Sequence, residues 1–275
     1  MSNDHHYLAE FLRARRELLQ PEEVGIPRDA HRRVRGLRRE EVASRAGISV
    51  EYYLRLEQGR DHQPSEQVLT SLARALILDE DAAAYLRRLA QPPAPVLQRT
   101  SNEVSCSVRR LLEQWAHTPA YVSDANLDIL AVNEAARHLA PGYLEPGRNL
   151  LLDVFEHADS AHDDSDWART AHRLTAALRF HAHRADPRFQ EILGELSTRH
   201  RTFRRMWALH DARRQTHGGN LHHIEPFGWV ELHWQTLEVP TTPVHFLTTF
   251  FADEDSPGEE ALRQLIRRVP GTQVA

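Results

Sequence analysis

The chain has 275 residues, enough for two domains of ordinary size, with 41% hydrophobic residues, 27% charged residues and a net charge of -5. The single cysteine, Cys106, excludes an intramolecular disulfide and a cysteine-rich zinc site. No stretch approaches the ~18 consecutive apolar residues of a membrane-spanning helix, and the charged N-terminus lacks the apolar core of a signal peptide. We therefore expect a cytoplasmic protein.

Positive charge is concentrated in one stretch of this acidic chain. Residues 28–39 hold six arginines against one acid, Asp29. Such a patch can meet phosphate groups, while the acidic remainder discourages nonspecific adhesion. A solvated charge run explains the same pattern, so the run by itself leaves both interpretations open. The six arginines are Arg28, Arg32, Arg33, Arg35, Arg38 and Arg39.

Apolar spacing and capping residues predict five short helices in residues 1–90, which together form a compact all-α domain. The first carries Leu8, Phe11, Leu12 and Leu19 on one face. Gly47 separates the second from the third, at a position that favours a left-handed backbone. The predicted helices are 8–19, 39–46, 50–58, a segment capped by Ser65, and 82–90.

The proline-rich sequence Gln91-Pro-Pro-Ala-Pro95 predicts a stiff, extended linker, because proline fixes φ and cannot donate a backbone hydrogen bond. We place the linker at residues 91–104. The second domain then spans residues 105–275.

The second domain mixes strands with helices. Residues 120–122 and 127–132 are predicted strands around a polar turn at 123–126. Helical spacing follows over the middle of the domain. The predicted helical segments are 133–139, 163–183, one beginning at Pro187, and 203–210.

The C-terminal part returns to strands. Gly218-Gly-Asn220 is predicted as a turn, and residues 229–239 and 244–251 as antiparallel strands. Residues 256–268 predict a final helix. Strands, helices and strands again indicate an α+β domain.

The stretch from Leu37 to Arg60 has the pattern of a helix-turn-helix: a short helix, a tight turn with a glycine, and a capped second helix. Apolar residues such as Val42, Tyr53 and Leu56 form an inner face, which leaves polar residues of the second helix pointing outward. Its N-terminus, with unpaired backbone N–H groups, is suited to approach phosphate.

This stretch resembles the helix-turn-helix of XRE-type (lambda-repressor-like) regulators, down to its ending Leu56-Glu57-Gln58-Gly59. The chain is similar here to actinobacterial regulators that carry an MmyB-like ligand-binding domain. The similar sequence is GLRREEVASRAGISVEYYLRLEQGR, followed by PSEQVLTSLARAL. Three later segments resemble that family in the same order: TPAYVSDANLDILAVNEAA, LSTRHRTFRRMWALHDARRQTHG and HIEPFGWVELHWQTLEVP.

The resemblance implies a five-helix lambda-repressor-like domain followed by an α+β, PAS-like sensor domain. It further implies a transcriptional regulator, not an enzyme, that is usually dimeric and binds double-stranded DNA and a small apolar or fatty-acid-like effector. No cofactor is required, and the protein is expected on the nucleoid. The expected DNA-binding residues are Arg38, Arg39, Ser49, Val50, Glu51, Tyr52, Arg55 and Arg60.

One position departs from the family pattern. XRE proteins commonly carry a glutamine near the start of the first helix of the motif, where this chain has Arg39. Arginine still binds phosphate, or guanine through two hydrogen bonds, so base readout differs while binding persists. The alternative for each arginine is a surface charge paired with a nearby glutamate, such as Arg55 with Glu51.

Large apolar and charged residues of the second domain are candidates for lining a ligand pocket, although each also fits a simple core or surface role. They are Phe155, Trp167, Leu174, Phe203, Trp207, Arg213, Trp229 and Trp234.

Two rival functions find less support in the sequence. No G-x-S-x-G, G-x-x-x-x-G-K-[ST] or G-x-G-x-x-G motif points to an enzyme. The 18 histidines raise the alternative of a metal-responsive regulator, but no H-E-x-x-H occurs, and His181 and His183 do not share a helical face.

Overall fold

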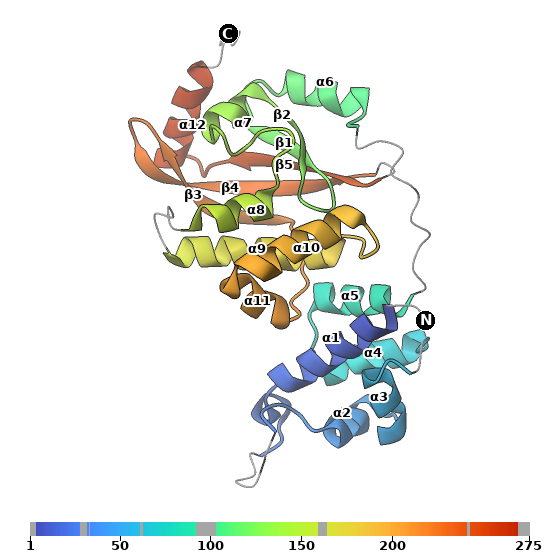
Figure 1. Ribbon diagram of the computed structural model, residues 1–275. Coiled ribbons are helices and arrows are strands. Elements are labelled where there is room, and N and C mark those ends of the chain that lie inside the picture. Colours follow the sequence, from blue (N-terminus) through green and yellow to red (C-terminus); the bar gives the residue numbers. More distant parts are fainter. Residues whose placement is uncertain are drawn as a thin grey trace. The chain divides into compact units, whose positions relative to one another are not determined.

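The computed structural model describes residues 4–27, 32, 34–60, 63–91, 103–158, 164–240 and 243–268 (Figure 1). By contacts the chain forms two compact units. The first is Met1–Val96 with Arg201–Arg214, and the second is Leu97–His200 with Gln215–Ala275. In the described residues, no helix is both long and apolar enough to cross a bilayer.

Short helices build the first unit. Side-chain oxygens of Ser49, Ser65 and Asp79 accept backbone N–H groups at the starts of three of them, as expected of N-caps. The helices are α1 (Asp4–Leu18), the 3-10 helix η1 (Pro21–Val24), α2 (Arg39–Ala46), α3 (Val50–Glu57), α4 (Glu66–Ala75), α5 (Glu80–Ala90) and α11 (Arg201–Ala208).

The turn between α2 and α3 is set by Gly47, which has a left-handed backbone with φ of 66°. Its N–H donates to the carbonyls of Ala43 and Ser44, so α2 is closed before Ile48 leads into α3. Leu8, Phe11 and Leu12 of α1 are fully buried behind this pair. The predicted helix-turn-helix is therefore present with its expected glycine.

A buried carboxylate joins the helices of the motif to α1. The side chain of Glu57, at the end of α3, is 1% exposed. Arg16 of α1 donates from Nε to Oε1 of Glu57 at 2.5 Å, and Arg39 of α2 donates from Nε to Oε2 at 2.6 Å. Arg16 also donates to the carbonyl of Leu37 at 3.0 Å. These contacts fix α3 against both neighbours.

We predict that Glu57→Gln loosens α1–α3, because removing one partner of a buried ion pair costs about 3 kcal/mol or more. Hydrogen exchange of the amides in α1–α3 should then accelerate by roughly 100-fold at neutral pH. Glu51→Gln, on the exposed side of α3, is the control and should leave exchange unchanged. Equal exchange in the two variants would contradict the role given to Glu57.

The second unit is α+β, as predicted. Its helices are α6 (Cys106–Gln114), α7 (Glu134–Leu139), α8 (Leu150–Glu156), α9 (Asp164–His181), α10 (Pro187–Arg199) and α12 (Pro257–Arg267). Its strands are β1 (Ala120–Ser123), β2 (Ile129–Val132), β3 (His217–Ile224), β4 (Gly228–Val239) and β5 (His245–Phe251). The layout of a helical domain followed by an α+β domain is confirmed.

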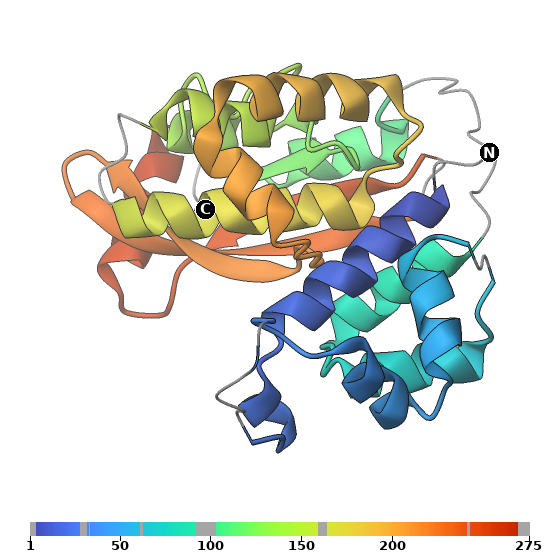
Figure 2. The ribbon, with the colours of Figure 1, turned by 60° about the horizontal axis from the view of Figure 1, so that its bottom comes forward.

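The five strands form one antiparallel sheet in the order β2-β1-β5-β4-β3. Figures 1 and 2 both show α9 running along this sheet. In β4, Val230, Leu232 and Trp234 are buried, whereas Trp229 and Glu231 of the opposite face are exposed. On that opposite face, α6 covers part of β1, β2 and β5.

The predicted turn at Gly218-Gly-Asn220 is wrong, because these residues lie inside β3. Gly218 is opposite Trp234 and Asn220 is opposite Leu232 in the register with β4. A Cβ on Gly218 would lie 2.5 Å from the Trp234 ring, so glycine is required here by close packing and not by a turn. The connection between β3 and β4 falls instead after Ile224.

Residues 201–214 fall within the range predicted for the second domain, but by their contacts they belong to the first unit. The backbone N–H of Arg214 donates to Oδ2 of Asp81 in α5 at 2.9 Å, and its guanidinium lies 3.3 Å from Oδ1. Arg213 reaches Asp79 at 3.3 Å. We call residues 201–214 the returning segment.

Candidate DNA-binding surface and ligand cavity

The N-terminal half of α3 presents an exposed surface. Ser49, Val50, Glu51 and Arg55 are exposed, whereas Tyr53, Leu56 and Glu57 of the same helix are buried. The Arg55 guanidinium stacks over the Tyr52 ring at 5.5 Å. The helix therefore hides one side in the core and offers the other to a partner.

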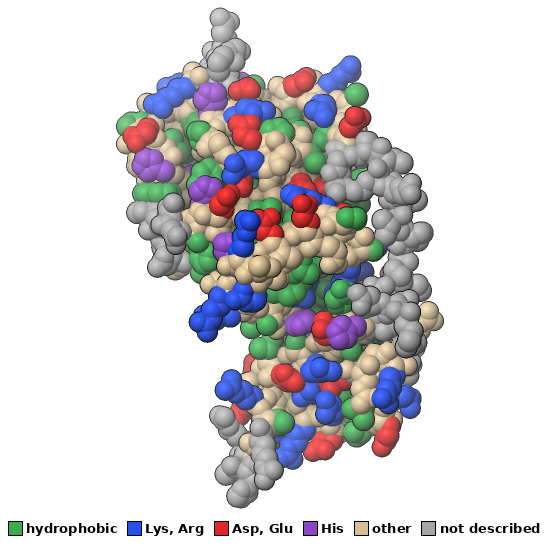
Figure 3. Space-filling model, in the orientation of Figure 1, with side chains coloured by type: hydrophobic (Ala, Val, Ile, Leu, Met, Phe, Trp, Pro, Cys, Tyr) green, Lys and Arg blue, Asp and Glu red, His purple; other side chains and the backbone are tan. Residues whose placement is uncertain are grey.

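The arginines around α3 differ in their surroundings. Arg60 is exposed, and Arg38 is partly exposed and lies 3.6 Å from Glu40. Arg39 keeps 47% of its side chain exposed although its Nε is bound to Glu57. Figure 3 shows basic side chains among acidic ones on the helix-turn-helix unit. These arginines keep cationic groups accessible in the helix-turn-helix and directly after it.

Arg32 does not belong to that group of exposed cations. Its side chain is 5% exposed and binds Glu41 at 2.8 and 2.5 Å, with a further bond to the carbonyl of Gly36 at 2.7 Å. The basic stretch is therefore partly a structural clamp at the start of α2. Arg28 and Arg33 of this stretch lie outside the described residues.

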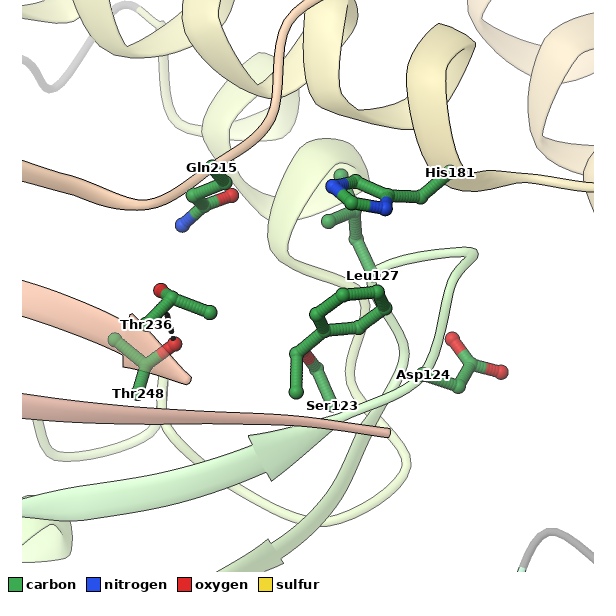
Figure 4. A pocket seen from close by; sticks show the side chains of 8 residues that line it. Ser123, Asp124, Leu127, His181, Gln215, Thr236 and Thr248 are labelled. Atoms are coloured by element: carbon green, nitrogen blue, oxygen red, sulfur yellow. Dashed lines mark hydrogen bonds between the residues drawn. The ribbon is translucent and has the colours of Figure 1, made fainter. Parts of the chain in front are cut away.

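A cavity opens inside the second unit between the end of α9 and the sheet (Figure 4). Its empty space of about 260 Å³ includes open solvent, and the cavity itself has room for about one water molecule. Six of its eight lining residues are polar and two, Leu127 and Phe246, are apolar. The lining residues are Ser123, Asp124, Leu127, His181, Gln215, Thr236, Phe246 and Thr248.

Some of the polar side chains that line the cavity hydrogen-bond each other. The hydroxyls of Thr236 and Thr248 bond each other across β4 and β5 at 2.8 Å. The side-chain oxygen of Gln215 is buried and has no hydrogen-bond partner among the described residues. His181 contacts Phe246 with ring centroids 4.4 Å apart. The cavity thus combines an unsatisfied acceptor with an apolar wall.

The eight ligand-lining residues predicted from the sequence do not line this cavity. Phe203, Trp207 and Arg213 fall in the first unit, and Trp229 is 45% exposed. Phe203 and Trp207 stack on each other, and Arg213 pairs with Asp211 and Asp79. Aromatic size alone therefore does not locate the cavity.

Of the remaining four, three are buried in the second unit and Trp167 is partly buried. Phe155 packs edge-to-face on Trp167, whose Nε1 donates to the carbonyl of Val154 at 2.8 Å. Leu174 is 4% exposed and Trp234 is 2% exposed. A polar residue at a buried position indicates the cavity better than a large aromatic residue does. Thr236 is such a residue, because it faces inward on a strand that otherwise buries apolar side chains.

A second polar group lies beneath α9. Arg173 stacks over Trp234 at 4.5 Å and donates to Oδ1 of Asn220 at 3.1 Å, and burial lowers its pKa to about 10. Nearby in the sheet, burial lowers the pKa of His222 to about 4. The Nε2 atom of His222 has no hydrogen-bond partner in the part of the chain that the structure describes. His222 is therefore neutral at physiological pH.

We predict that His222 makes the second unit less stable in mild acid. Between pH 6.5 and about 4 the unfolded chain binds a proton at this residue that the folded chain refuses, so stability falls as the pH falls through that window. Between pH 7 and about 5, the melting temperature of His222→Gln should fall less than that of the wild-type chain. His223→Gln, at the exposed neighbouring position, is the control and should behave as wild type; no difference between the variants would contradict the assignment.

Within the described ranges, no group of three or more histidine, cysteine, aspartate or glutamate side chains converges in a way that could hold a metal ion. The neighbouring His222 and His223 point to opposite faces of β3, because successive residues of a strand do so.

A capped recognition helix on one unit and a cavity in the other define a class of protein: a DNA-binding transcription regulator with a ligand-binding domain. A protein-family model for a helix-turn-helix domain matches residues 7–86. The model of the MmyB-like transcription regulator ligand binding domain matches residues 104–265, more than half of the chain. The chain therefore belongs to the MmyB-like transcription regulators. A comparison with curated protein sequences gives no match.

Proposed function

We propose that the protein is a homodimer that binds specific sites on chromosomal DNA and is controlled by a small apolar or fatty-acid-like molecule. The observation that carries the DNA-binding part is the exposed N-terminal half of α3, whose other side is locked in the core by Glu57. Such a helix is free to enter the major groove without rearrangement of its domain. We expect the protein in the cytoplasm, on the nucleoid.

The proposed contacts follow from exposure and chemistry. Ser49, Val50, Glu51 and Tyr52 face the bases from the first turn of α3, while the arginines Arg38, Arg39, Arg55 and Arg60 bind phosphates, with Arg55 also in reach of a base. Arg39 has a second role, since it holds Glu57, so its replacement changes stability as well as binding. Arg55 therefore gives the cleaner test.

We predict that Arg55→Ala weakens binding to the operator by about 1–3 kcal/mol and, if Arg55 binds a phosphate, reduces the salt slope by about one. The operator comes from genome-wide binding-site mapping, and affinities come from fluorescence anisotropy across a salt series. Arg199→Ala, an exposed arginine of α10, is the matched control. Wild-type affinity at every salt concentration would refute the assignment of Arg55.

Two copies of the chain would present two recognition helices about 34 Å apart, or a multiple of that distance, along the DNA. Footprinting of the operator should then reveal a near-palindromic site with protection of both halves. Protection of one isolated half-site would argue against the homodimer.

The returning segment supports control of DNA binding from the ligand-binding domain. It lies within the matched ligand-binding region, yet Arg213 pairs with Asp79, and Arg214 pairs with Glu80 and Asp81 of α5. The next residue, Gln215, lines the cavity. A change at the cavity is therefore one peptide bond away from a residue anchored on the DNA-binding unit.

We predict that a change in the cavity alters the operator affinity through the contact between Arg214 and Asp81. Ser123→Val adds apolar bulk to the cavity and should change the operator affinity, whereas the same change in an Asp81→Ala background should have a smaller effect. A coupling of about 0.5 kcal/mol or more in this double-mutant cycle is expected. Glu66→Ala, whose exposed carboxylate pairs with Arg87, is the control background. Additive effects of Ser123→Val and Asp81→Ala would rule out this route.

A further inference from the structure

An acidic side chain stands on the proposed DNA-binding surface. Glu51 lies in the first turn of α3 and is exposed. Within the described part of the chain, its carboxylate has no hydrogen-bond or ion-pair partner. The phosphates of DNA repel a carboxylate, whereas the N4 amino group of cytosine donates a hydrogen bond to one in the major groove. A first-turn acid also stabilises the helix dipole, and that role would require no DNA.

Arg55 lies on the same side of α3 as Glu51, because residues four apart in a helix are neighbours on its surface. Its guanidinium stacks over the ring of Tyr52 at 5.5 Å. Tyr52 is three residues nearer the N-terminus, so the stack draws the head group of Arg55 toward the first turn of the helix. Stacking uses the face of a guanidinium, whereas its hydrogen bonds are made in its plane, where two of them match two acceptors side by side.

The backbone that carries these two charged side chains is fixed from behind. Tyr53, Leu56 and Glu57, on the inner side of α3, are fully buried. At the start of the helix, Ser49 and Val50 are exposed and short, so α3 can approach the edges of the bases closely. Recognition of a particular base needs placement within about 0.5 Å, which side chains on a rigid element achieve.

We propose that Arg55 donates two hydrogen bonds to O6 and N7 of a guanine, and that Glu51 accepts one from N4 of a cytosine. At 1.5 Å per residue the two residues are about 6 Å apart along α3, the length of about two base-pair steps. Each operator half-site therefore contains this guanine and this cytosine within about two base pairs of each other. Tyr52 is a positioning residue for Arg55. This inference rests on the proposed function and deepens it by naming the bases that are read.

Two modified bases test these contacts with the full-length chain and its mapped operator. 7-Deazaguanine lacks the N7 acceptor, and N4-methylcytosine places a methyl group where the amino group would donate into the major groove; both keep normal base pairing. At one guanine of each half-site, 7-deazaguanine should lower the wild-type affinity by roughly 10-fold, and N4-methylcytosine should do so at one cytosine. Arg55→Ala should bind the guanine and 7-deazaguanine operators equally, and Glu51→Ala should bind the cytosine and N4-methylcytosine operators equally.

Matched variants separate base reading from other roles. Arg60→Ala, at an exposed arginine after α3, should weaken binding to every operator alike, as expected of a phosphate contact. Glu66→Ala makes the same change in the first turn of α4 and should keep the wild-type sensitivity to both modified bases. Tyr52→Leu removes the ring beneath Arg55 and should reduce the sensitivity to 7-deazaguanine by about 3-fold, whereas Tyr52→Phe keeps the ring and should retain it.

Each comparison is a ratio of two affinities of one variant, so partial unfolding lowers both affinities and leaves the ratio unchanged. Wild-type sensitivity to 7-deazaguanine in Arg55→Ala would overturn the assignment of Arg55. Wild-type sensitivity to N4-methylcytosine in Glu51→Ala would overturn that of Glu51. A wild-type chain that binds its operator but is insensitive to both modified bases would overturn the whole proposal and leave the DNA-binding function standing.

Discussion

The buried carboxylate of Glu57 is the constraint on which the DNA-binding unit depends. It takes one arginine from α1 and one from α2, so three helices meet at one charge. Because a buried carboxylate is costly without such partners, both arginines are held in place as firmly as the carboxylate itself. The result is a recognition helix whose inner side is fixed and whose outer side stays accessible.

The ligand-binding unit is organised by a polar strip inside an otherwise apolar layer. Tyr121, Thr236 and Thr248 lie on the buried face of the sheet, beside apolar residues such as Leu232. The hydroxyls of Thr236 and Thr248 bond each other, and the oxygen of Gln215 at the edge of the strip has no hydrogen-bond partner among the described residues. Specific recognition of a small molecule needs few polar groups when the rest of the cavity excludes water.

The chain connects these two sites through a short path. Gln215 ends the returning segment, and the preceding residue is bound through its backbone to Asp81 of the DNA-binding unit. Asp81 accepts the backbone N–H of Arg214 and also pairs with its guanidinium, so the main chain is held at Arg214. The control of DNA binding by a ligand that we propose would act through this anchored segment.

Local signals in the sequence predicted much of the first unit. Gly47, Ser49 and Ser65 act at close range, through φ or through a cap, so helix boundaries followed from neighbours in the chain. The helix-turn-helix and the α+β layout were predicted correctly. The short helices α6 and α8 were not predicted, because tertiary packing, and not their own periodicity, stabilises helices of this length.

The features that the sequence did not predict depend on contacts between residues distant in the chain. The sequence alone determined the order of elements, the capped recognition helix and the family, because each depends on residues a few positions apart. The tertiary structure decided that Glu57 is a shared buried charge, that Gly218 serves the packing of Trp234, and that Gln215 faces a cavity. Each of these pairs residues distant in sequence, and the burial that gives a polar group its role exists only after the chain has folded.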